Sequence, residues 1–363
     1  MRVLIASGGS GGHIFPAVSL AEELKKDNVE IIFVASRRRL DRNIIQNRDY
    51  KKIFLSANPM PYKFSWRFVT FLAKLAIDSI CALYILLRFR PDVVVGFGGY
   101  IAGAILLLAA MDGHIKTVIH EQNLVPGRTN RLLERFVDSV AISFPDTKKY
   151  FRNKNVVFTG NPLREESLKE YRSEAFNSLG LERDKMTILV MGGSQGASSL
   201  NDLVSRSISL LPSEKKKNIQ LVHIAGPKEP ERIQKRYNEN GIQGKVLTFI
   251  RDINEAYSVS DLAISRSGAA AIFELAAFKK PMVLIPYPDR KNNQRFNAGF
   301  FAGKNAAICI DEKNTGLEEL RDLITELVDN PAKRKALSEN AGRLSVVDGA
   351  RRLKELVQGQ VSL

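Results

Sequence analysis

The sequence predicts an α/β protein made of two domains, each a doubly wound parallel sheet. Short, apolar, β-branched runs alternate with helical stretches along nearly the whole chain, and glycine-rich turns follow most of these runs. Strands that are apolar throughout, rather than at every second residue, are typical of parallel sheets covered on both faces. The length of 363 residues exceeds that of one ordinary domain and suits two.

The predicted strands form two series separated by the breaker cluster Thr159-Gly160-Asn161-Pro162. We therefore expect one domain over residues 1–160 and a second over 161–345, with a final helix over about 346–358 that packs back on the first. The first series is Val3–Ala6, Ile31–Ala35, Asp92–Val95, Thr117–His120 and Val156–Thr159. The second series is Thr187–Met191, Gln220–Ile224, Lys245–Phe249, Leu262–Ser265, Pro281–Ile285 and Ala307–Ile310.

Cysteine and histidine are scarce in this chain. The two cysteines, Cys81 and Cys309, cannot form a disulfide framework and favour a reducing compartment. The four histidines show no metal-ligand spacing with one another or with the cysteines, so we expect no metal site. The apolar stretch at the N-terminus is too short for a signal peptide, which predicts a protein that stays in the cytoplasm.

The net charge is +15 and is unevenly distributed. Residues 1–160 hold 23 Lys and Arg against 13 Asp and Glu, and the remaining residues hold 31 against 26. A basic surplus favours phosphate groups, nucleic acid or anionic lipid as partners. The basic residues are not interleaved along one helix and no nucleic-acid-binding motif occurs, so we expect no nucleic acid partner.

The segment from Phe64 to Phe89 is dense in Phe, Trp, Leu and Ile, but Arg67, Lys74 and Asp78 interrupt it. These charges leave no run of about 18 apolar residues, which argues against a membrane-spanning helix. Two interpretations stay open. The segment is either a core helix or helix pair of the first domain, or an amphipathic surface that lies in an anionic membrane interface beside its flanking Lys and Arg residues.

A glycine-rich loop, Ser7 to His13, follows the first predicted strand and precedes a helix that we expect Pro16 to open. Glycines let the backbone approach an anion, and the free amide groups of a helix start point toward it. The loop lacks the sequence of a Walker phosphate loop. The second strand ends in Ser36 and three arginines rather than in the acidic residue that a dinucleotide fold requires.

Two further glycine loops follow predicted strands, at residues 96–103 and 191–197. Three such loops over two domains favour two anionic groups held in one cleft between the domains. The stretch Ser265-Arg266-Ser267-Gly268 also follows a strand and leads into a helix that carries Glu274. Open parallel sheets bind ligands at this position, and a carboxylate there can accept hydrogen bonds from a vicinal diol such as ribose.

Six motifs in order carry a family resemblance. They are GGSGGHIFPA, GFGGYIAG, HEQN at 120–123, TGNPLR at 159–164, GGSQGA at 192–197 and SRSGAAAIFELAA at 265–277. Over essentially the whole chain the sequence resembles the MurG family of peptidoglycan N-acetylglucosaminyltransferases. The resemblance implies a GT-B fold, in which two Rossmann-like domains face each other across a cleft. UDP-GlcNAc would bind mainly to the C-terminal domain, and undecaprenyl-diphosphate-linked MurNAc-pentapeptide (lipid I) to the N-terminal one.

The resemblance also implies roles for individual residues. Arg164 would support the nucleotide and the leaving UDP, Ile250 would meet the uracil through its backbone, and Glu274 would hold the ribose hydroxyls. Asn123 and Gln294 would face the GlcNAc hydroxyls. The diphosphates and the donor sugar would meet Ser194, the helix start formed by Ala269, Ala270, Ala271, Ile272 and Phe273, and the first loop through Ser10, Gly11 and Gly12.

Two positions depart from the family pattern. Ala271 stands where the family usually has a threonine, so one hydroxyl near the diphosphate is missing. Asn293-Gln294 stands where the family usually has two glutamines. These departures affect the expected fine contacts and leave the implied reaction unchanged.

The family inverts the anomeric centre, which implies a single in-line displacement of UDP by the acceptor hydroxyl. His13 is the candidate base, because the ordinary pKa of histidine lies near 6.5 and His13 belongs to the first glycine loop. The alternative is a histidine that only hydrogen-bonds a turn or a phosphate. No Asp-x-Asp occurs, so we expect no required cofactor or metal, although an added divalent metal could stimulate the reaction.

The implied location is the cytoplasmic face of the cell membrane, as a peripheral protein in contact with other cell-wall enzymes. Three alternatives stay open. They are another UDP-sugar-dependent lipid glycosyltransferase, a UDP-GlcNAc epimerase of the same fold, and a non-catalytic basic protein that binds nucleotides or nucleic acid. An epimerase would need no lipid surface, and a binding protein would neither transfer nor hydrolyse the UDP-sugar.

Overall fold

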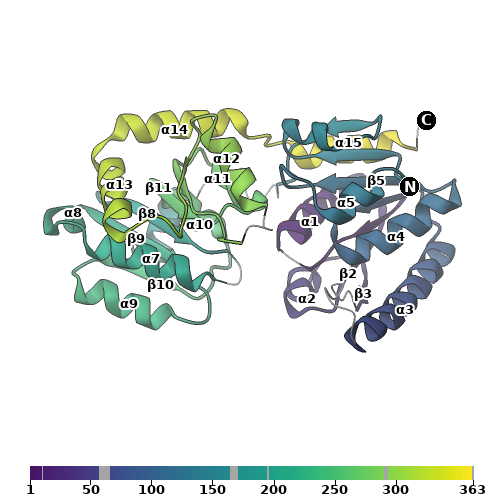
Figure 1. Ribbon diagram of the computed structural model, residues 1–363, viewed down its shortest axis with the longest axis horizontal. Coiled ribbons are helices and arrows are strands. Elements are labelled where there is room, and N and C mark those ends of the chain that lie inside the picture. Colours follow the sequence, from purple (N-terminus) through teal and green to yellow (C-terminus); the bar gives the residue numbers. More distant parts are fainter. Residues whose placement is uncertain (10, 57–65, 164–170, 194–195, 290–292, 362–363) are drawn as a thin grey trace. The chain divides into compact units, whose positions relative to one another are not determined.

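The computed structural model describes residues 1–9, 11–56, 66–163, 171–193, 196–289 and 293–361. It separates into two compact units, Met1–Arg164 with Val346–Leu363, and Glu165–Ser345 (Figure 1). Each unit is a parallel sheet with helices on its faces, which confirms the predicted fold class.

The first unit contains a seven-stranded sheet in the order β3-β2-β1-β4-β5-β6-β7, with every neighbouring pair parallel. Two of its strands, β3 and β6, were not predicted from the sequence. The bounds are β1 Arg2–Ala6, β2 Glu30–Ser36, β3 Lys51–Leu55, β4 Val93–Gly96, β5 Lys116–Glu121, β6 Ser139–Ile142 and β7 Val156–Phe158.

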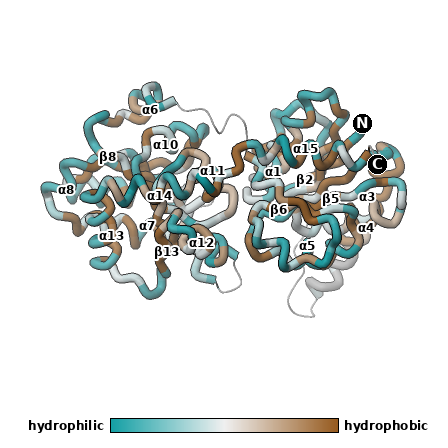
Figure 2. Tube along the Cα trace, turned by 90° about the horizontal axis from the view of Figure 1, so that it is seen from above, coloured by the Kyte–Doolittle hydropathy of each residue, from teal (hydrophilic) through white to brown (hydrophobic). Residues whose placement is uncertain are grey.

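Helices cover both faces of this sheet and enclose two hydrophobic cores. One core lies between the sheet and the helices α1 and α15, and the other lies between the sheet and α3 and α4. The apolar residues of the central strands β2, β5 and β6 stand out in Figure 2. The helices are α1 Gly11–Lys25, α2 Arg39–Ile45, α3 Trp66–Phe89, α4 Gly99–Asp112, α5 Arg128–Leu133 and α15 Gly349–Gly359, with a 3-10 helix η1 at Pro145–Tyr150.

The start of α1 corrects one expectation. The helix begins at Gly11, so Pro16 lies inside it and does not open it. Proline inside a helix removes one hydrogen bond to the residue four positions earlier and crowds that carbonyl group. Here that residue is Gly12, in the glycine loop, and the buried Ile14, Pro16 and Val18 still pack the helix on the sheet.

The second unit contains a six-stranded parallel sheet in the order β10-β9-β8-β11-β12-β13. Its strands are β8 Met186–Met191, β9 Ile219–Ile224, β10 Gln243–Leu247, β11 Leu262–Ser265, β12 Met282–Leu284 and β13 Ile308–Cys309. The helices are α6 Arg172–Leu179, α7 Ser198–Ser209, α8 Ser213–Asn218, α9 Pro230–Glu239, α10 Ile253–Val259, α11 Ala269–Ala277, α12 Gln294–Ala302, α13 Leu317–Asp329 and α14 Pro331–Leu344.

The strand β10 ends two residues before the predicted run. We expected Lys245–Phe249, but Phe249 is 69% exposed and lies beyond the strand. The strand begins earlier because Gly244 passes close to β9, where a Cβ would lie 2.7 Å from the Leu221 carbonyl oxygen. Only glycine permits that approach.

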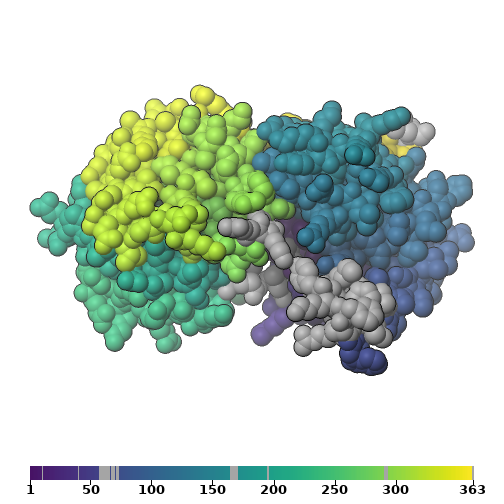
Figure 3. Space-filling model, viewed as in Figure 1, coloured from purple at the N-terminus to yellow at the C-terminus, as the bar shows by residue number. Residues whose placement is uncertain are grey.

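The segment 64–89 is a single long helix over its described part. Helix α3 lies against α4 at the outside of its unit, and its blue atoms lie at the surface in Figure 3. Ala82, Ile85, Leu86 and Phe89 are buried in the core, whereas several large apolar side chains on the same helix are exposed. Among the described residues, no helix is both long and apolar enough to cross a bilayer.

Candidate functional site

Each sheet has one switch point, where the order of the strands reverses and the loops that follow two neighbouring strands diverge. In the first unit it lies between β1 and β4, and in the second between β8 and β11. Open parallel sheets bind ligands at the carboxyl ends of the strands at such points. All four glycine- or serine-rich loops that the sequence singled out follow one of these strands.

The first glycine loop is held in place by a buried aspartate. Gly9 donates its backbone N–H to Asp41 Oδ2 over 2.9 Å, and Ser36 Oγ donates to the same oxygen. Gly8 has a φ of +153°, and a Cβ there would lie 2.7 Å from Asp41 Oδ2. The loop therefore requires glycine at this position, and Asp41, which the sequence analysis did not single out, fixes its course.

The second loop packs against the first and against His13. Gly98 and Gly99 have φ of +89° and +81°. A Cβ on Gly98 would lie 3.5 Å from His13 Nε2, and one on Gly99 would lie 3.2 Å from the carbonyl oxygen of Gly8. The two loops of the first unit, far apart in the sequence, thus form one surface around His13.

His13 lies in a setting that favours the neutral imidazole. Burial lowers the pKa of His13 below 6.5, and the carboxylates of Glu121 and Asp41 and the backbone of Gly8 oppose this shift only in part. Within the described part of the chain, its Nδ1 has no hydrogen-bond partner. A neutral ring can accept a proton at neutral pH.

Glu121 organises the loop that follows β5. Its Oε1 accepts hydrogen bonds from the backbone N–H of Asn123 at 2.9 Å and from the Asn123 side chain at 3.2 Å. Its Oε2 accepts from the backbone of Gly127 at 2.9 Å and from Asn130 Nδ2 at 2.8 Å. The buried carboxylate therefore fixes the orientation of the Asn123 amide and leaves little room for Glu121 itself to act as an acid or base.

The neighbouring His120 is fully buried and structural in its contacts. Its Nε2 donates to the carbonyl oxygen of Gly160 at 3.2 Å, and its Nδ1 accepts from Gln122 Nε2 at 3.0 Å. Burial lowers the pKa of His120 to about 4, which keeps it neutral at pH 7. The hydrogen bond to Gly160 connects the end of β5 with the residues that follow β7.

In the second unit, the loop after β8 turns through two glycines before α7 begins. Gly193 and Gly196 have φ of +90° and +71°, and Gly196 donates its N–H to the carbonyl of Gly193 at 3.0 Å. A Cβ on Gly196 would lie 2.5 Å from the Ala225 carbonyl oxygen. The loop therefore rests directly on the backbone that follows β9.

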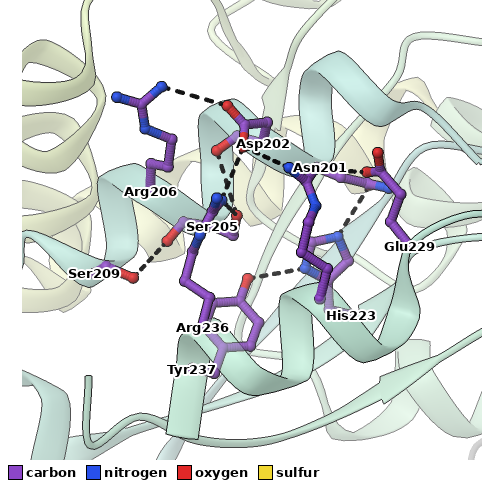
Figure 4. A network of polar contacts seen from close by, with 10 residues as sticks. Asn201, Asp202, Ser205, Arg206, Ser209, His223, Glu229, Arg236 and Tyr237 are labelled. Atoms are coloured by element: carbon purple, nitrogen blue, oxygen red, sulfur yellow. Dashed lines mark hydrogen bonds and ion pairs between the residues drawn. The ribbon is translucent and has the colours of Figure 1, made fainter. Parts of the chain in front are cut away.

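A buried polar chain holds that backbone (Figure 4). Asn201, in the first turn of α7, donates to the Ala225 carbonyl at 2.8 Å, and its Oδ1 accepts from His223 Nε2 at 3.1 Å. His223 Nδ1 in turn accepts from the hydroxyl of Tyr237 at 2.9 Å. Burial lowers the pKa of His223 to about 3, so the ring is neutral and its two nitrogens keep distinct roles.

Glu274 lies on α11, which begins directly after the serine-rich turn that follows β11. The hydroxyl of the buried Tyr257 donates to Glu274 Oε2 at 2.8 Å. Tyr257 comes from α10, so the carboxylate is oriented by a second element. No sequence motif points to Tyr257, because the two residues are 17 positions apart in different helices.

A buried ion pair braces the same edge of the sheet. Arg266 pairs with Glu312 at 2.7 Å and also donates to the carbonyls of Ile285 and Pro286 at 3.2 and 3.1 Å. Next to it, Ser267 Oγ donates to the Gln294 carbonyl at 2.9 Å. These contacts connect the ends of β11, β12 and β13 with the first residue of α12.

Most of the remaining residues predicted for the site lie in the described part of the chain, and three do not. Gly11 and Gly12 form the first turn of α1, and Ala269–Phe273 form the first turns of α11 after Gly268. Ile250 lies between β10 and α10, and Gln294 accepts from the Tyr287 N–H at 2.9 Å. Ser10, Arg164 and Ser194 lie outside the described residues. In the described part of the chain, no three His, Cys, Asp or Glu side chains form a group suited to a metal ion.

Comparison with known proteins identifies both halves of the chain. Residues 3–142 match the glycosyltransferase family 28 N-terminal domain, and residues 187–353 match the glycosyltransferase family 28 C-terminal domain. Two similar proteins carry the name UDP-N-acetylglucosamine–N-acetylmuramyl-(pentapeptide) pyrophosphoryl-undecaprenol N-acetylglucosamine transferase. The one from Thermoanaerobacter sp. (strain X514) is 35% identical, covering 99% of both chains. The one from Citrifermentans bemidjiense is 36% identical, covering 96% of this chain and 97% of its own.

Solved structures agree with this match. Acinetobacter baumannii MurG superposes with a TM-score of 0.78 at 26% identity, covering 99% of both chains. Staphylococcus aureus MnaA, solved with UDP, reaches 0.72 at 13% identity over 100% of this chain and 97% of its own. The UDP-GlcNAc 2-epimerase of Neisseria meningitidis reaches 0.68 at 13% identity over 99% and 100%. At 13% identity, the last two show a similar fold and nothing more. The chain therefore belongs to the family of UDP-N-acetylglucosamine–N-acetylmuramyl-(pentapeptide) pyrophosphoryl-undecaprenol N-acetylglucosamine transferases, and it is a glycosyltransferase of family 28.

Proposed function

We propose that this chain transfers GlcNAc from UDP-GlcNAc to the 4-hydroxyl of MurNAc in undecaprenyl-diphospho-MurNAc-pentapeptide, which converts lipid I to lipid II. Family membership supports the reaction, since relatives named for this transfer match nearly the full chain at 35–36% identity. On the chain's own residues, the observation that carries the proposal is the oriented Glu274 carboxylate beside the start of α11.

The second unit has the groups that a nucleotide diphosphate requires. The first amide groups of a helix lack partners within the helix and bind anions, and α11 and α7 both start at the switch point. Glu274 would accept from the ribose hydroxyls, with Tyr257 holding its second oxygen. We assign the diphosphate to the helix starts and the loop at 192–197, so that negative charge developing on the departing UDP meets oriented N–H groups.

In the first unit, His13 would remove the proton from the acceptor hydroxyl. Its lowered pKa keeps the ring neutral at pH 7. The two glycine loops around it would let the backbone approach a bound ligand closely. Asn123, oriented by Glu121, would hydrogen-bond the hydroxyls of the transferred sugar. Asp41 would act indirectly, by fixing the first loop.

One experiment tests donor, acceptor and reaction type together. The purified chain is incubated with labelled UDP-GlcNAc, UDP-GalNAc or UDP-Glc, and with undecaprenyl-diphospho-MurNAc-pentapeptide, with diacylglycerol or with no acceptor. We expect transfer from UDP-GlcNAc alone, and only when the lipid-linked acceptor is present. Transfer to diacylglycerol would indicate a different lipid glycosyltransferase. Conversion of UDP-GlcNAc to its 2-epimer without acceptor would instead favour the epimerases that share the fold.

We further propose that the chain meets its lipid-linked acceptor at the cytoplasmic face of the membrane through α3. Ile77, Ile80, Tyr84 and Leu87 are 58%, 68%, 67% and 63% exposed. Their spacing of three and four residues places them on one side of the helix, and the exposed Lys74, Arg88 and Arg90 accompany them. An apolar stripe with basic neighbours is typical of a helix that lies in an anionic lipid interface.

A further inference from the structure

A basic hollow lies at the edge of the second sheet opposite the switch-point loops. Its volume is about 470 Å³, and we call it the amino-edge pocket. Met186, Asp261 and Pro281 in its wall stand at or just before the amino ends of β8, β11 and β12. The other walls come from the start of α6, the residues just before β8, the residues after α11 and the first half of α14. The loops assigned to the donor follow the carboxyl ends of β8 and β11, so this pocket is a separate place.

The pocket concentrates positive charge. Its lining includes three arginines and four lysines but only two carboxylates, those of Asp184 and Asp261, a surplus of five. Residues 161–363 together hold 31 Lys and Arg against 26 Asp and Glu, also a surplus of five. The lining of this hollow thus carries as large a surplus as the whole C-terminal half.

Several of these cations are fixed by neutral acceptors. Arg334 Nη1 donates to the Val328 carbonyl at 2.8 Å, and Arg183 Nη2 donates to the Ser173 carbonyl at 3.2 Å. Arg183 also stacks on the ring of Phe176, 5.5 Å from its centroid. Carbonyl and ring contacts orient a cation without cancelling its charge. Three other lining cations are paired: Arg172 with Asp261 at 3.2 Å, Lys185 with Glu182 at 2.9 Å and Lys335 with Glu339 at 4.0 Å. Among the described residues, no such pair is made by Arg183, Arg334 or Lys279.

Lys279 occupies a position that normally favours glycine. It follows α11 with a φ of +50°, a conformation that costs energy for a side chain with a Cβ. Its carbonyl accepts from Ser338 Oγ, and its side chain runs over Gly342, where a Cβ would lie 3.0 Å from Lys279 Cγ. The backbone and the aliphatic part of this lysine are therefore held in place at the pocket.

The start of α14 adds further positive charge to the pocket. The amino end of a helix carries partial positive charge and favours acidic side chains. The first turn of α14 has no acidic residue, and Arg334 and Lys335 of its opening turns line the pocket. Repulsion among these groups is relieved when an anion enters.

We propose that the amino-edge pocket binds a soluble anion that carries two or more phosphate groups. The surplus of five charges suits a multivalent anion, and the volume of about 470 Å³ lies within the range of small-molecule sites. The lining is polar and charged rather than apolar, which favours a phosphate compound over a hydrophobic ligand. The site does not depend on the proposed transfer reaction.

The test measures pyrophosphate binding by calorimetry on the full chain at low salt, with saturating UDP present to occupy the donor site. We expect one further equivalent to bind. Arg183→Gln with Lys279→Gln should weaken it at least tenfold. The matched control, Lys216→Gln with Lys217→Gln on α8, removes the same charge from the same unit and should change affinity less than twofold. Arg183 and Lys279 are exposed, so both double variants should keep the wild-type melting temperature.

Two results would overturn the proposal. One is the absence of any pyrophosphate binding that depends on Arg183 and Lys279, with or without UDP. The other is an equal loss in both double variants, which would show a general charge effect. Failure of UDP itself to bind would count against the donor site and leave the comparison of variants intact.

A second experiment distinguishes a soluble anion from a lipid headgroup as the ligand of the amino-edge pocket. Co-sedimentation with phosphatidylglycerol vesicles should be unchanged in the Arg183→Gln, Lys279→Gln variant, because the pocket is assigned to a soluble ligand. If that variant loses vesicle binding while pyrophosphate affinity stays at the wild-type value, the pocket is a membrane contact and the proposal is wrong.

Discussion

Three residues of the predicted motifs are held in position by hydrogen bonds to the side chains of partner residues. Glu274 is oriented by Tyr257 from α10, Asn123 by Glu121 at the end of β5, and Gly9 by Asp41 of α2. Each of the three functional residues belongs to a motif that the sequence displays. Their partners Tyr257 and Asp41 belong to none, because only the tertiary fold brings them into contact.

The Glu274 carboxylate gives a prediction for donor binding. Glu274→Ala should weaken UDP-GlcNAc binding by about 1–3 kcal/mol, because charged hydrogen bonds to the ribose diol are lost. Tyr257→Phe should cause a smaller loss, since it removes only the hydroxyl that holds Glu274 Oε2. Tyr84→Phe, on the exposed side of α3, is the control. Calorimetry that returned unchanged donor affinity for Glu274→Ala would remove this assignment.

His13 gives a prediction for turnover. His13→Ala should leave UDP-GlcNAc affinity nearly intact and reduce kcat by about 10²–10⁴-fold, the usual contribution of a general base. In the wild-type chain, kcat/KM should fall on the acid side only below pH 6.5, because burial lowers the pKa of His13 and the neutral ring is the active form. Turnover of the variant within a few fold of wild type would mean that His13 only binds a turn or a phosphate.

At the scale of elements, every strand of the two sheets except β3 and β6 could be predicted from the sequence. The strand β4 is apolar and buried throughout, and β1 is so after its first residue, Arg2, so composition alone reveals both. The strand β3 begins with two lysines and lies half-buried at an edge of the sheet, so it lacks that signal. The strand β6 begins with Ser139, whose hydroxyl donates to Gln360 just after α15, a residue 221 positions away that only the fold brings close.

Helix α3 has two apolar sides, one buried in the core and one exposed. Its residues at 82, 85, 86 and 89 fill the core of the first unit, while the stripe at 77, 80, 84 and 87 is exposed. Hydrophobic content alone cannot separate these two sides, because both are apolar. Only the position of α4 decides which side faces the sheet.

This division of α3 predicts opposite outcomes for two similar substitutions. Ile85→Glu should unfold the first unit or lower its melting temperature strongly, because a buried unpaired carboxylate is costly. Ile80→Glu should leave the melting temperature unchanged and reduce co-sedimentation with anionic vesicles, more so at low salt. Wild-type protein that fails to bind such vesicles at low salt would refute a membrane contact through α3.

At the scale of the whole molecule, each unit buries a neutral histidine at the end of a strand near its switch-point loops. Burial lowers the pKa of His120 to about 4 in the first unit and that of His223 to about 3 in the second. The unfolded chain holds these histidines at an ordinary pKa near 6.5. Acid therefore acts on both units through the same chemistry, although the units belong to separate compact bodies.

The sign of the resulting pH dependence follows from linkage. Below pH 6.5 the unfolded chain takes up protons that the folded chain refuses, so the free energy of unfolding falls as pH decreases, until the folded-state pKa is reached. At pH 5 the loss is about 2 kcal/mol for each of the two histidines, from about 1.4 kcal/mol per pKa unit. Carboxylates with lowered pKa, such as Asp202 and Asp348, start from 3.8 and titrate below this window.

Calorimetric melting at pH 7.5 and pH 5 tests this account. We expect acidification to lower the melting temperature of both units, and UDP to raise the temperature of the transition that belongs to the second. His223→Gln should reduce the stability of the second unit at pH 7.5, because its bonds to Asn201 and Tyr237 are weakened, but should also flatten the pH dependence of that transition. The exposed His114→Gln is the matched control and should change neither. An unaltered pH dependence in His223→Gln would show that the second unit's acid sensitivity comes from other groups.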